Sequence, residues 1–495
     1  MSANSCALES LAPVVERFYR AVVCCAGDVM LDRFVYGSVS RISPEAPVPV
    51  LHIREQHSML GGAGNAVRNL HALACAVRFF SVVGDDAAAG EIEAVLRGLS
   101  RCEWFLEREA GRQTTIKSRF IADAQQIMRA DAESSQETGP QAPNAVLARF
   151  TAAVSESSVA LLCDYGKGLL TGSRAQQFIR AARAAEKPVI VDPKGSDFRR
   201  YNGATVIKPN LRELAEATAL PVTTAAAQEA AARALLAHIE VDYLLVTCGA
   251  AGMLLVSRAG AARRFPALAR EVFDVSGAGD TVAAILAAAL GSGARIVEAV
   301  EAANLAAGIV VGKRGTAVVT GPEIAHELQQ RTLIGAADKV LRADKMLDQA
   351  RRWERSGRRI GFTNGCFDLL HPGHISLLET ARANCDCLVV GLNSDQSAAR
   401  LKGRFPVQNE ATRALVLASL RCVDAVTIFE EDSPLELIRQ IRPHVLVKGR
   451  DYQPHEVLGA DLLPAWNGEL LMVDLLPGHS TSRTLARLAG KENGQ

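Results

Sequence analysis

The sequence predicts two α/β domains, each with a largely parallel sheet covered by helices. The chain has 495 residues, more than a single hydrophobic core usually supports. Short apolar runs alternate with alanine-rich helical segments, and this alternation is typical of a doubly wound sheet. The strand pattern stops after about residue 320 and resumes near residue 357. We therefore expect one domain over residues 1–335 and a second over residues 336–495.

In the first half, each expected strand is short, almost continuously apolar and followed by a polar or glycine-containing turn. In doubly wound sheets, ligands bind beyond the carboxyl ends of the strands, where polar side chains follow these runs. The strand candidates are Ala21–Ala26, Val159–Cys163, Pro188–Val191, Thr205–Ile207 and Tyr243–Val246.

The segment from Phe34 to Ile53 has a different pattern. It is interrupted by three prolines and alternates between apolar and polar residues. This pattern predicts hairpin-like strands outside the main sheet. A small lid or an oligomer contact is the expected use, and exposed strand edges make a homodimer through this domain plausible.

In the second half, an amphipathic helix over Leu341–Trp353 precedes a new series of strands and helices. This series predicts a Rossmann-like domain. The strand candidates are Ile360–Phe362, Cys387–Gly391, Ala425–Ile428, Val445–Val447 and Leu470–Val473.

Composition excludes several classes of protein. With 55 basic and 54 acidic residues, global charge gives no reason to expect nucleic acid or membrane binding. The eleven cysteines are irregularly spaced, and without a CxxC pair they do not indicate zinc. The N-terminus lacks the pattern of a signal peptide, and the most apolar run, Val282–Leu290, is too short to span a bilayer. We expect a cytoplasmic enzyme with reduced thiols.

The first phosphate-handling motif is Asp274–Thr281, which precedes a strongly helical run. Gly277, Ala278 and Gly279 place free backbone amides at a helix N-terminus, which favours an anion. Asp280 lies beside these amides and can accept a proton from an attacking hydroxyl group. Alone, this motif could equally be an ordinary glycine-rich helix start with a terminal acid.

Other motifs in the same order resemble the ribokinase family of sugar kinases. The resemblance implies that Gly62 and Asn65, with the early acids Asp28 and Asp32, contact the sugar. It also implies a nucleotide and phosphate site formed by Asn210, Glu213, Thr247, Gly249 and Asn304. Val275 departs from the family, in which threonine is common, but valine removes neither the base nor the amides.

Further motifs resemble the heptose 7-phosphate kinase branch of that family. They are Gln125–Gln126, Asp164–Gly168 and Asp192–Gly195. A sugar phosphate needs cationic groups in its pocket. Arg129, Lys194 and Lys208 are candidates, and each could equally be a solvated surface charge.

The second phosphate-handling motif is Gly365–His374, which lies between an apolar strand and a helix. The spacing of His371 and His374 across the helix start places both imidazoles beside the same free amides. Two alternatives are metal ligation and a structural role. No third ligand has suitable spacing for a metal.

The full string resembles the HxGH nucleotidyltransferase superfamily. The resemblance implies that His371, His374 and Lys402 stabilise negative charge as pyrophosphate leaves. It implies that Thr363, Asn364 and Lys448 position the triphosphate, and that Ser480 and Thr481 bind its outer phosphates. No general base is required, because a sugar phosphate oxygen is already anionic.

The two domains in this order resemble the bifunctional heptose kinase and adenylyltransferase family of lipopolysaccharide synthesis. The resemblance implies phosphorylation of D-glycero-D-manno-heptose 7-phosphate at O1, and adenylyl transfer from ATP to heptose 1-phosphate. ATP and Mg²⁺ are the implied cofactors, with no resident metal site. The alternatives are another sugar kinase fused to a cytidylyltransferase, or a regulatory protein with one inactive domain.

Overall fold

This computed structural model describes residues 11–122, 125–134, 138–268, 272–313, 315–450 and 453–474. The chain divides into two compact units between Leu328 and Gln329, inside helix α11 (Gly321–Ala337). The predicted boundary after residue 335 lies in the same helix. Each unit is described by itself below.

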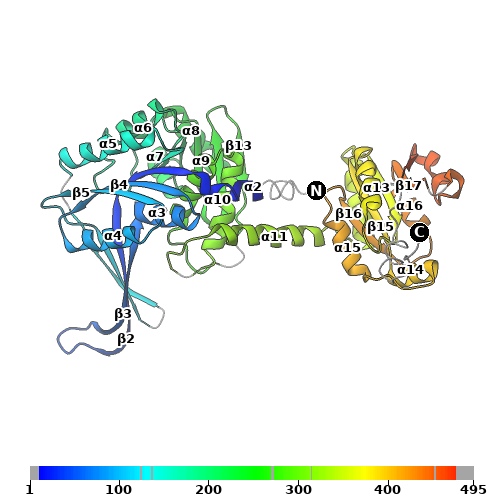
Figure 1. Ribbon diagram of the computed structural model, residues 1–495, viewed down its shortest axis with the longest axis horizontal. Helices are drawn as coiled ribbons and strands as arrows, with labels where there is room; N and C mark the ends of the chain where they lie inside the picture. The colour runs from blue at the N-terminus through cyan, green and yellow to red at the C-terminus, as the bar shows by residue number, and fades with distance from the viewer. Residues whose placement is uncertain are drawn as a thin grey trace, which may run out of the picture. The chain divides into compact units, whose positions relative to one another are not determined.

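The first unit contains a nine-stranded sheet in the order β13-β12-β11-β10-β9-β8-β1-β4-β5 (Figure 1). Its neighbouring strands are parallel except for the β11–β12 and β12–β13 pairs, which are antiparallel. This confirms the predicted doubly wound sheet. The strands are β1 (Val22–Gly27), β4 (Ala76–Gly84), β5 (Cys102–Glu109), β8 (Val159–Cys163), β9 (Val189–Asp192), β10 (Val206–Ile207), β11 (Tyr243–Thr247), β12 (Met253–Ser257) and β13 (Ala262–Phe265).

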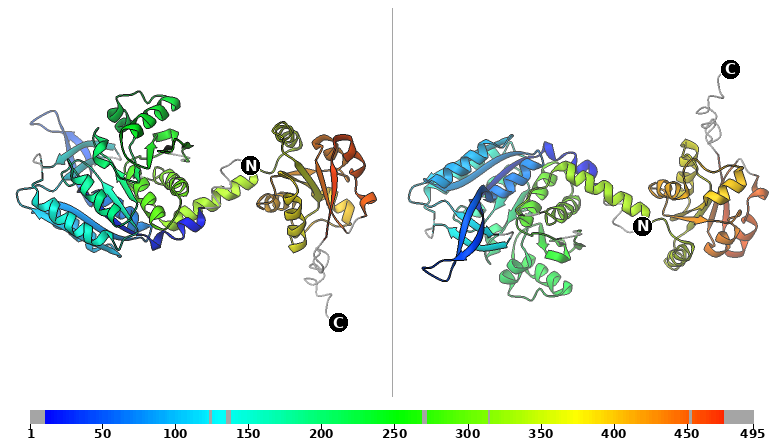
Figure 2. Two further views of the ribbon diagram at one scale, coloured as in Figure 1. Left: turned by 90° about the horizontal axis from the view of Figure 1, so that it is seen from above. Right: turned by 90° about the horizontal axis from the view of Figure 1, so that it is seen from below.

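Helices cover both faces of this sheet because successive strand side chains point to opposite sides. In β1, Val23 and Cys25 pack into one hydrophobic cluster, whereas Cys24 and Ala26 pack into another. The first cluster contains residues of α3 (Ala63–Ala72), α4 (Ala87–Arg97), α9 (Ala278–Gly291) and α10 (Ile296–Val310). The second contains residues of α5 (Gln141–Val154), α6 (Arg174–Ala184), α7 (Leu211–Thr218) and α8 (Ala225–His238), and Figure 2 shows the helical layers from two sides.

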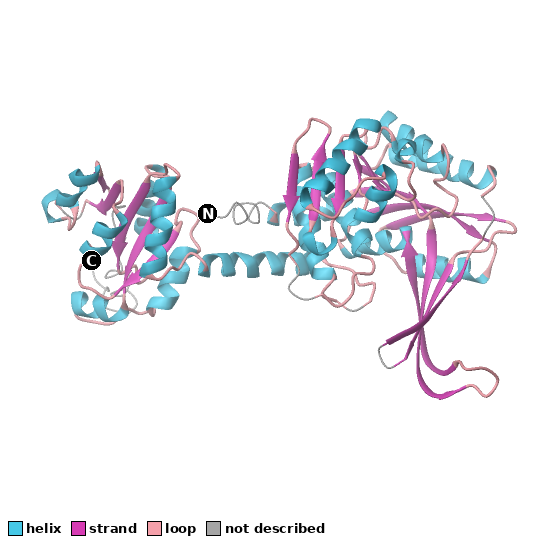
Figure 3. Ribbon diagram, turned by 180° about the vertical axis from the view of Figure 1, so that it is seen from behind, coloured by secondary structure: helices cyan, strands magenta, loops and turns pink. Residues whose placement is uncertain are grey.

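A separate four-stranded sheet, here called the lid sheet, projects from this unit (Figure 3). Its strands are β2 (Val29–Ile42), β3 (Pro49–Gly62), β6 (Ile116–Ala122) and β7 (Gln125–Ala132), in the order β3-β2-β6-β7. The predicted hairpin is therefore present but longer at both ends. Because β2 follows β1 after one residue and β3 leads directly into α3, the base of the lid sheet adjoins the carboxyl end of β1.

The second unit contains a five-stranded parallel sheet in the order β16-β15-β14-β17-β18. Its strands are β14 (Ile360–Gly365), β15 (Cys387–Asn393), β16 (Ala425–Phe429), β17 (Val445–Gly449) and β18 (Glu469–Val473). Its helices are α12 (Ala343–Arg355), α13 (Pro372–Ala383), α14 (Asp395–Lys402), α15 (Glu410–Ala418) and α16 (Leu435–Ile441). All five predicted strands are present, and the helix predicted over Leu341–Trp353 corresponds to α12.

Short helices complete the described chain: α2 (Ala12–Val15) and the 3₁₀ turns η1 (Phe18–Arg20), η2 (Phe198–Tyr201), η3 (Gly249–Ala251), η4 (Pro454–Glu456) and η5 (Ala460–Trp466). No helix in the described ranges combines the length and apolar character needed to cross a bilayer.

Candidate active sites

A phosphate cradle lies at the N-terminus of α9. Gly277 precedes this helix with φ of 80°, a conformation that favours glycine. A Cβ at this position would lie 2.7 Å from Thr316 Cγ2 and 2.9 Å from Asn65 Nδ2, so the packing also requires glycine. The helix starts at Ala278, and its first amides, together with the helix dipole, favour an anion.

Asp280, the predicted base, is held by two side chains from distant parts of the chain. Asn65 Nδ2 donates to its Oδ2 at 2.7 Å, and the Tyr165 hydroxyl donates to its Oδ1. Burial raises the pKa of Asp280 to about 6, and the nearby carboxylate of Asp192 adds to this rise. At pH 7 the carboxylate is therefore ionised but much more basic than an ordinary aspartate, as a general base requires.

Lys208 provides a buried positive charge beside the cradle. Its Nζ forms an ion pair with Asp192 Oδ1 at 2.9 Å and lies 3.4 Å from the position of a Cβ at Gly279. Only 5% of its side chain is exposed, so it is not a solvated surface charge. Of the two interpretations left open by the sequence, this geometry favours a role toward phosphate, on the nucleotide side of Asp280.

Asn210 and Glu213 form a capping box at the start of α7. Asn210 Oδ1 accepts from the Glu213 amide, and Glu213 Oε2 accepts from the Asn210 amide, both at 2.9 Å. Burial is the main cause of the raised pKa of Glu213, and the charge of Asp192 contributes. The capping box thus fixes a carboxylate near the Lys208–Asp192 pair.

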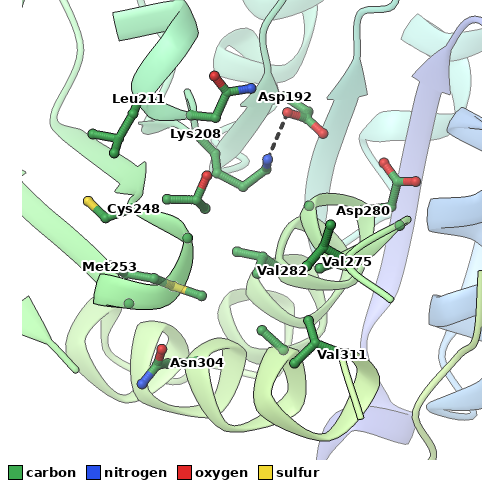
Figure 4. A pocket seen from close by; sticks show the side chains of 18 of the residues that line it. Asp192, Lys208, Leu211, Cys248, Met253, Val275, Asp280, Val282, Asn304 and Val311 are labelled. Atoms are coloured by element: carbon green, nitrogen blue, oxygen red, sulfur yellow. Dashed lines mark ion pairs between the residues drawn. The ribbon is translucent and has the colours of Figure 1, made fainter. Parts of the chain in front are cut away.

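A cavity of about 840 Å³ extends from the cradle toward α10. Figure 4 shows its polar end at Asp192, Lys208 and Asp280, and an apolar end that includes Met253 and Val311. These two ends suit the phosphates and the base of a nucleotide. The predicted residues that line it are Lys194, Lys208, Asn210, Glu213, Thr247, Gly249, Gly277, Ala278, Gly279, Asp280 and Asn304.

Asn304 is already partly engaged at the apolar end. Its Nδ2 donates to the carbonyl oxygen of Pro266 at 2.8 Å. This bond fixes the orientation of the amide at the wall of the cavity.

Two of the residues expected to contact the sugar also have partners within the chain. The Asp28 carboxylate accepts from the backbone amides of Tyr165, Lys167 and Leu169 at 2.9 to 3.1 Å and so holds the loop after β8. Asn65 donates to Asp280. Their contacts with the sugar stay a prediction.

Gly62 and Asp32 lie where the lid sheet meets α3. Gly62 has φ of 57°, and a Cβ there would lie 2.6 Å from the carbonyl oxygen of Asp28. Asp32 forms an ion pair with Arg119 at 2.7 Å and is only 6% exposed. Glycine is thus required for close approach of the two segments, and Asp32 is fixed at the edge of the expected sugar pocket.

Arg129 and Lys194, the other predicted phosphate-binding cations, lie in different places. Arg129 is on β7, is half-exposed and forms an ion pair with Asp131 at 2.9 Å. Lys194 is exposed and lines the nucleotide cavity. The structure therefore does not bring Arg129, Lys194 and Lys208 together into one sugar phosphate site.

Sequence reasoning missed two side chains that position the base. Tyr165 contacts Asp280 directly, and Arg68 donates to Asn65 Oδ1 at 3.2 Å. Tyr165 lies within the motif Asp164–Gly168, which was noticed only for its resemblance to other proteins. No local signal marks Arg68, because its role depends on α3 packing beside α9.

In the second unit, His371 and His374 lie side by side at the start of α13. Their ring centroids are 3.8 Å apart with an interplanar angle of 20°, and Phe367 lies 5.0 Å from the His374 ring. His371 occupies the N-cap position, and Pro372 begins the helix. Burial lowers the pKa of His374 to about 4, and the charges of His371 and Lys402 contribute. Before nucleotide binds, His374 is therefore neutral at pH 7 and acts as a hydrogen-bonding group.

The other predicted residues of this site surround the two histidines. Lys402 is the last residue of α14, and its charge reaches His374. Thr363 and Asn364 end β14, where Thr363 is 1% exposed. Lys448 on β17 donates to the carbonyl oxygen of Asn364 at 3.1 Å. Ser480 and Thr481 lie outside the described residues.

One buried polar atom in this region, Asn364 Oδ1, has no hydrogen-bond partner in the described chain. Buried polar atoms are normally paired, so unpaired ones indicate a ligand site. Among the described residues, no group of three or more His, Cys, Asp or Glu could hold a metal ion.

Arg413 on α15, which was not among the predicted site residues, holds the loop before His371. Its fully buried guanidinium donates to the carbonyl oxygens of Cys366, Asn393 and Gln408, and to Asp395 Oδ1 at 2.7 Å. It thereby connects the segment before His371 to the carboxyl end of β15.

Comparisons with known proteins agree with this two-part organisation. Residues 20–321 match the pfkB family of carbohydrate kinases, and residues 362–474 match the cytidylyltransferase-like family. The chain resembles a ribokinase from Arabidopsis thaliana, solved with ribose and ATP, at 18% identity and a TM-score of 0.50 over 62% of this chain and 99% of that one. It also resembles phosphofructokinase-2 from Escherichia coli, with 17% identity and a TM-score of 0.52 over 63% and 98%. These likenesses confirm the ribokinase-like fold.

Full-length relatives are much more similar. The chain is 51% identical to the bifunctional protein HldE of Paramagnetospirillum magneticum, over 98% of this chain and 99% of that protein. It is 49% identical to the bifunctional protein HldE of Rhodospirillum rubrum, over 97% of each. Both predicted domains are thus matched along one continuous alignment, and the chain belongs to the HldE family of bifunctional proteins, with a sugar kinase and a nucleotidyltransferase in one polypeptide.

Proposed function

We propose that this chain carries out two steps of ADP-heptose synthesis. The first unit phosphorylates D-glycero-D-manno-heptose 7-phosphate at O1 with ATP. The second transfers the adenylyl group of ATP to heptose 1-phosphate and releases pyrophosphate. Removal of the 7-phosphate between these steps requires a separate phosphatase reaction. Both substrates of each step are small molecules. We place the reactions in the cytoplasm, where ATP is available.

One observation carries the kinase assignment. Asp280 is a basic carboxylate held between a phosphate cradle and the base of the lid sheet. In the proposed reaction, O1 of the heptose attacks the γ-phosphorus of ATP, the bond from this phosphorus to the bridging oxygen breaks so that ADP leaves, and the proton of O1 passes to Asp280. Lys208 and the first amides of α9 stabilise the charge on the transferred phosphoryl group.

The carboxylates near the cradle fit a magnesium–ATP complex. Asp192 and Glu213 supply the oxygen ligands that Mg²⁺ prefers, directly or through water. When bound, the metal would neutralise charge on the β- and γ-phosphates.

For the second step, the phosphate oxygen of heptose 1-phosphate attacks the α-phosphorus of ATP. The P–O bond to the β-phosphate breaks, and no proton needs to leave the nucleophile. The first amides of α13, the imidazoles of His371 and His374, and Lys402 are placed to stabilise this charge.

We also infer a homodimer through the lid sheet. Large apolar side chains on its strands are exposed: Ile42 by 61%, Ile53 by 55% and Met128 by 53%. A projecting sheet with exposed apolar groups is a surface that favours pairing with another copy. The molar mass in solution, with Ile53→Lys as the matched variant, tests this contact.

The enzymatic proposal is tested by product analysis with the purified full chain. Heptose 7-phosphate and ATP should yield ADP and heptose 1,7-bisphosphate, identified by the phosphorus NMR signal of the new anomeric phosphate. Heptose 1-phosphate should then release pyrophosphate with ATP, and much less with CTP. Preference for CTP, or failure to phosphorylate any heptose phosphate at O1, would contradict the proposal.

A further inference from the structure

One face of the lid sheet carries a cluster of charged side chains. Residues paired across neighbouring strands point to the same face of a sheet. Asp32 on β2 pairs with Lys117 on β6, which in turn pairs with Asp131 on β7. Two residues further along β6, Arg119 pairs with Arg129 on β7. These five side chains therefore lie on one face.

Lys117 differs from the other cations of this cluster. Arg119 forms an ion pair with Asp32 at 2.7 Å, and Arg129 forms one with Asp131 at 2.9 Å. The side chain of Lys117 makes no hydrogen bond or ion pair within the part of the chain that the structure describes. It is half-buried, and this burial is the main reason for its lowered pKa.

The carboxylates nearest in charge to Lys117, Asp32 and Asp131, are each paired with an arginine. Lys167, in the loop after β8, lies close enough to lower the pKa of Lys117 further, and its own partner is Glu133. The cluster then has four cations for three acids: Lys117, Arg119, Arg129 and Lys167 against Asp32, Asp131 and Glu133. A half-buried ammonium whose neighbouring carboxylates, Asp32 and Asp131, are already paired with arginines is suited to an anionic ligand.

This cluster connects to the catalytic base from two directions. On one side, Asp32 lies close enough to Arg68 for its charge to raise the pKa of that guanidinium. Arg68 donates to Asn65, which in turn donates to Asp280. On the other, Lys167 is two residues from Tyr165, which donates to Asp280.

Neither lysine of the cluster lines the nucleotide cavity, which includes Asp280 and Tyr165 in its wall. Lys117 and Lys167 thus lie outside the nucleotide cavity, whereas Asp280 lies in its wall. A sugar with its reacting hydroxyl at Asp280 would extend the rest of its carbon chain toward them.

We propose that Lys117, with Lys167 beside it, binds the phosphate that the sugar substrate already carries. This inference rests on the proposed kinase function and assigns the specificity of the first unit for a phosphorylated sugar over the free sugar. Lys208 and Lys194, which lie in the nucleotide cavity, do not serve this phosphate. The paired cations Arg119 and Arg129 keep Asp32 and Asp131 from repelling it.

The test compares a phosphorylated and an unphosphorylated substrate. Lys117→Met removes the charge and keeps the apolar stem. We expect its kcat/KM for heptose 7-phosphate to fall about 10- to 100-fold, the effect of losing a charge-assisted hydrogen bond. The kcat/KM for unphosphorylated heptose should change by less than about twofold, because only the 7-phosphate lacks its partner.

Two further variants serve as controls. Lys117→Arg, which keeps the charge, should retain most of the preference for the phosphorylated sugar. Arg54→Met removes an exposed charge from β3 of the same sheet and should leave both substrates unaffected. An equal loss with both substrates in Lys117→Met, or no loss with either, would overturn the proposal.

A binding measurement separates failure of this inference from failure of the proposed function. With a non-hydrolysable ATP analogue saturating both nucleotide sites, inorganic phosphate should raise the Tm of the full chain, and Lys117→Met should abolish this rise. Stabilisation that persists in the variant, or is absent from the wild type, refutes the subsite. If the wild type does not phosphorylate heptose 7-phosphate but the Tm effect depends on Lys117, the function is wrong and the phosphate subsite stands.

Discussion

Replacement of Asp280 by asparagine should separate the activity of the kinase unit from its stability. The substitution preserves shape, and the side-chain oxygen can still accept from Tyr165. It removes the carboxylate that lies at the start of α9 and is held by Asn65. Loss of a general base lowers turnover by about 10²- to 10⁴-fold. Adenylyl transfer by the second unit should be unchanged, which provides an internal control in the same sample.

Stability should change in the opposite direction. The pKa of Asp280 rises from its ordinary 3.8 to about 6, so the folded state binds the proton more tightly than the unfolded state. The free energy of unfolding therefore decreases as pH rises from about 4 to about 6 and stays lower above that range. The ionised carboxylate thus costs at most about 3 kcal/mol at pH 7. The stability of Asp280→Asn relative to the wild type should therefore be about 2 kcal/mol greater at pH 7.5 than near pH 4.5, where about a third of this cost remains.

Two measurements test this reasoning. Kinase kcat/KM in the wild type should fall tenfold for each pH unit below about 6, as Asp280 becomes protonated. Urea unfolding of wild type and Asp280→Asn, followed at both pH values, gives the change in stability. An Asp280→Asn variant that kept more than about a tenth of wild-type kinase turnover would refute the role of base. Equal stability changes at both pH values would refute the account of the raised pKa.

Three other predictions concern the two sites. His374→Ala should lower adenylyl transfer by about 10²- to 10³-fold without affecting the kinase. In the wild type, the pH profile of kcat/KM for adenylyl transfer should show no inflection from this histidine between about pH 5 and 8. Gly277→Ala should reduce kinase kcat/KM about tenfold or more, because the new Cβ would contact Thr316 and Asn65. In addition, a φ of 80° strains an alanine by about 1 to 2 kcal/mol. Normal kinetics would contradict the packing argument. Arg413→Lys should destabilise the second unit by about 3 kcal/mol, measured by urea unfolding, because an ammonium cannot replace the fork of donors.

Features that depend on local sequence could be predicted from the chain alone. The apolar runs identified β1, β8, β9, β10 and β11 nearly to the residue, because a buried parallel strand must be apolar on both faces, whereas β4 and β5 were not among the predicted strands. The glycines before α9 and the histidines around Pro372 marked the starts of both helices, since a helix N-terminus is encoded by adjacent residues. The antiparallel edge formed by β12 and β13 was not predicted, because strand direction depends on pairing rather than on local pattern.

The sequence determined the identity of the chemistry, since Asp280, His371 and His374 can be found from their neighbours along the chain. Only the tertiary structure decided what holds these groups and sets their pKa values. Tyr165 and Asn65 reach Asp280 from 115 and 215 residues away, and Arg413 reaches the loop before His371 from 47 residues away. The tertiary structure also separated the cations, placing Lys208 in the cavity beside α9 and Lys117 on the lid sheet. Desolvation and charge depend on distances in space, which residue order does not specify until the sheets and helices have packed.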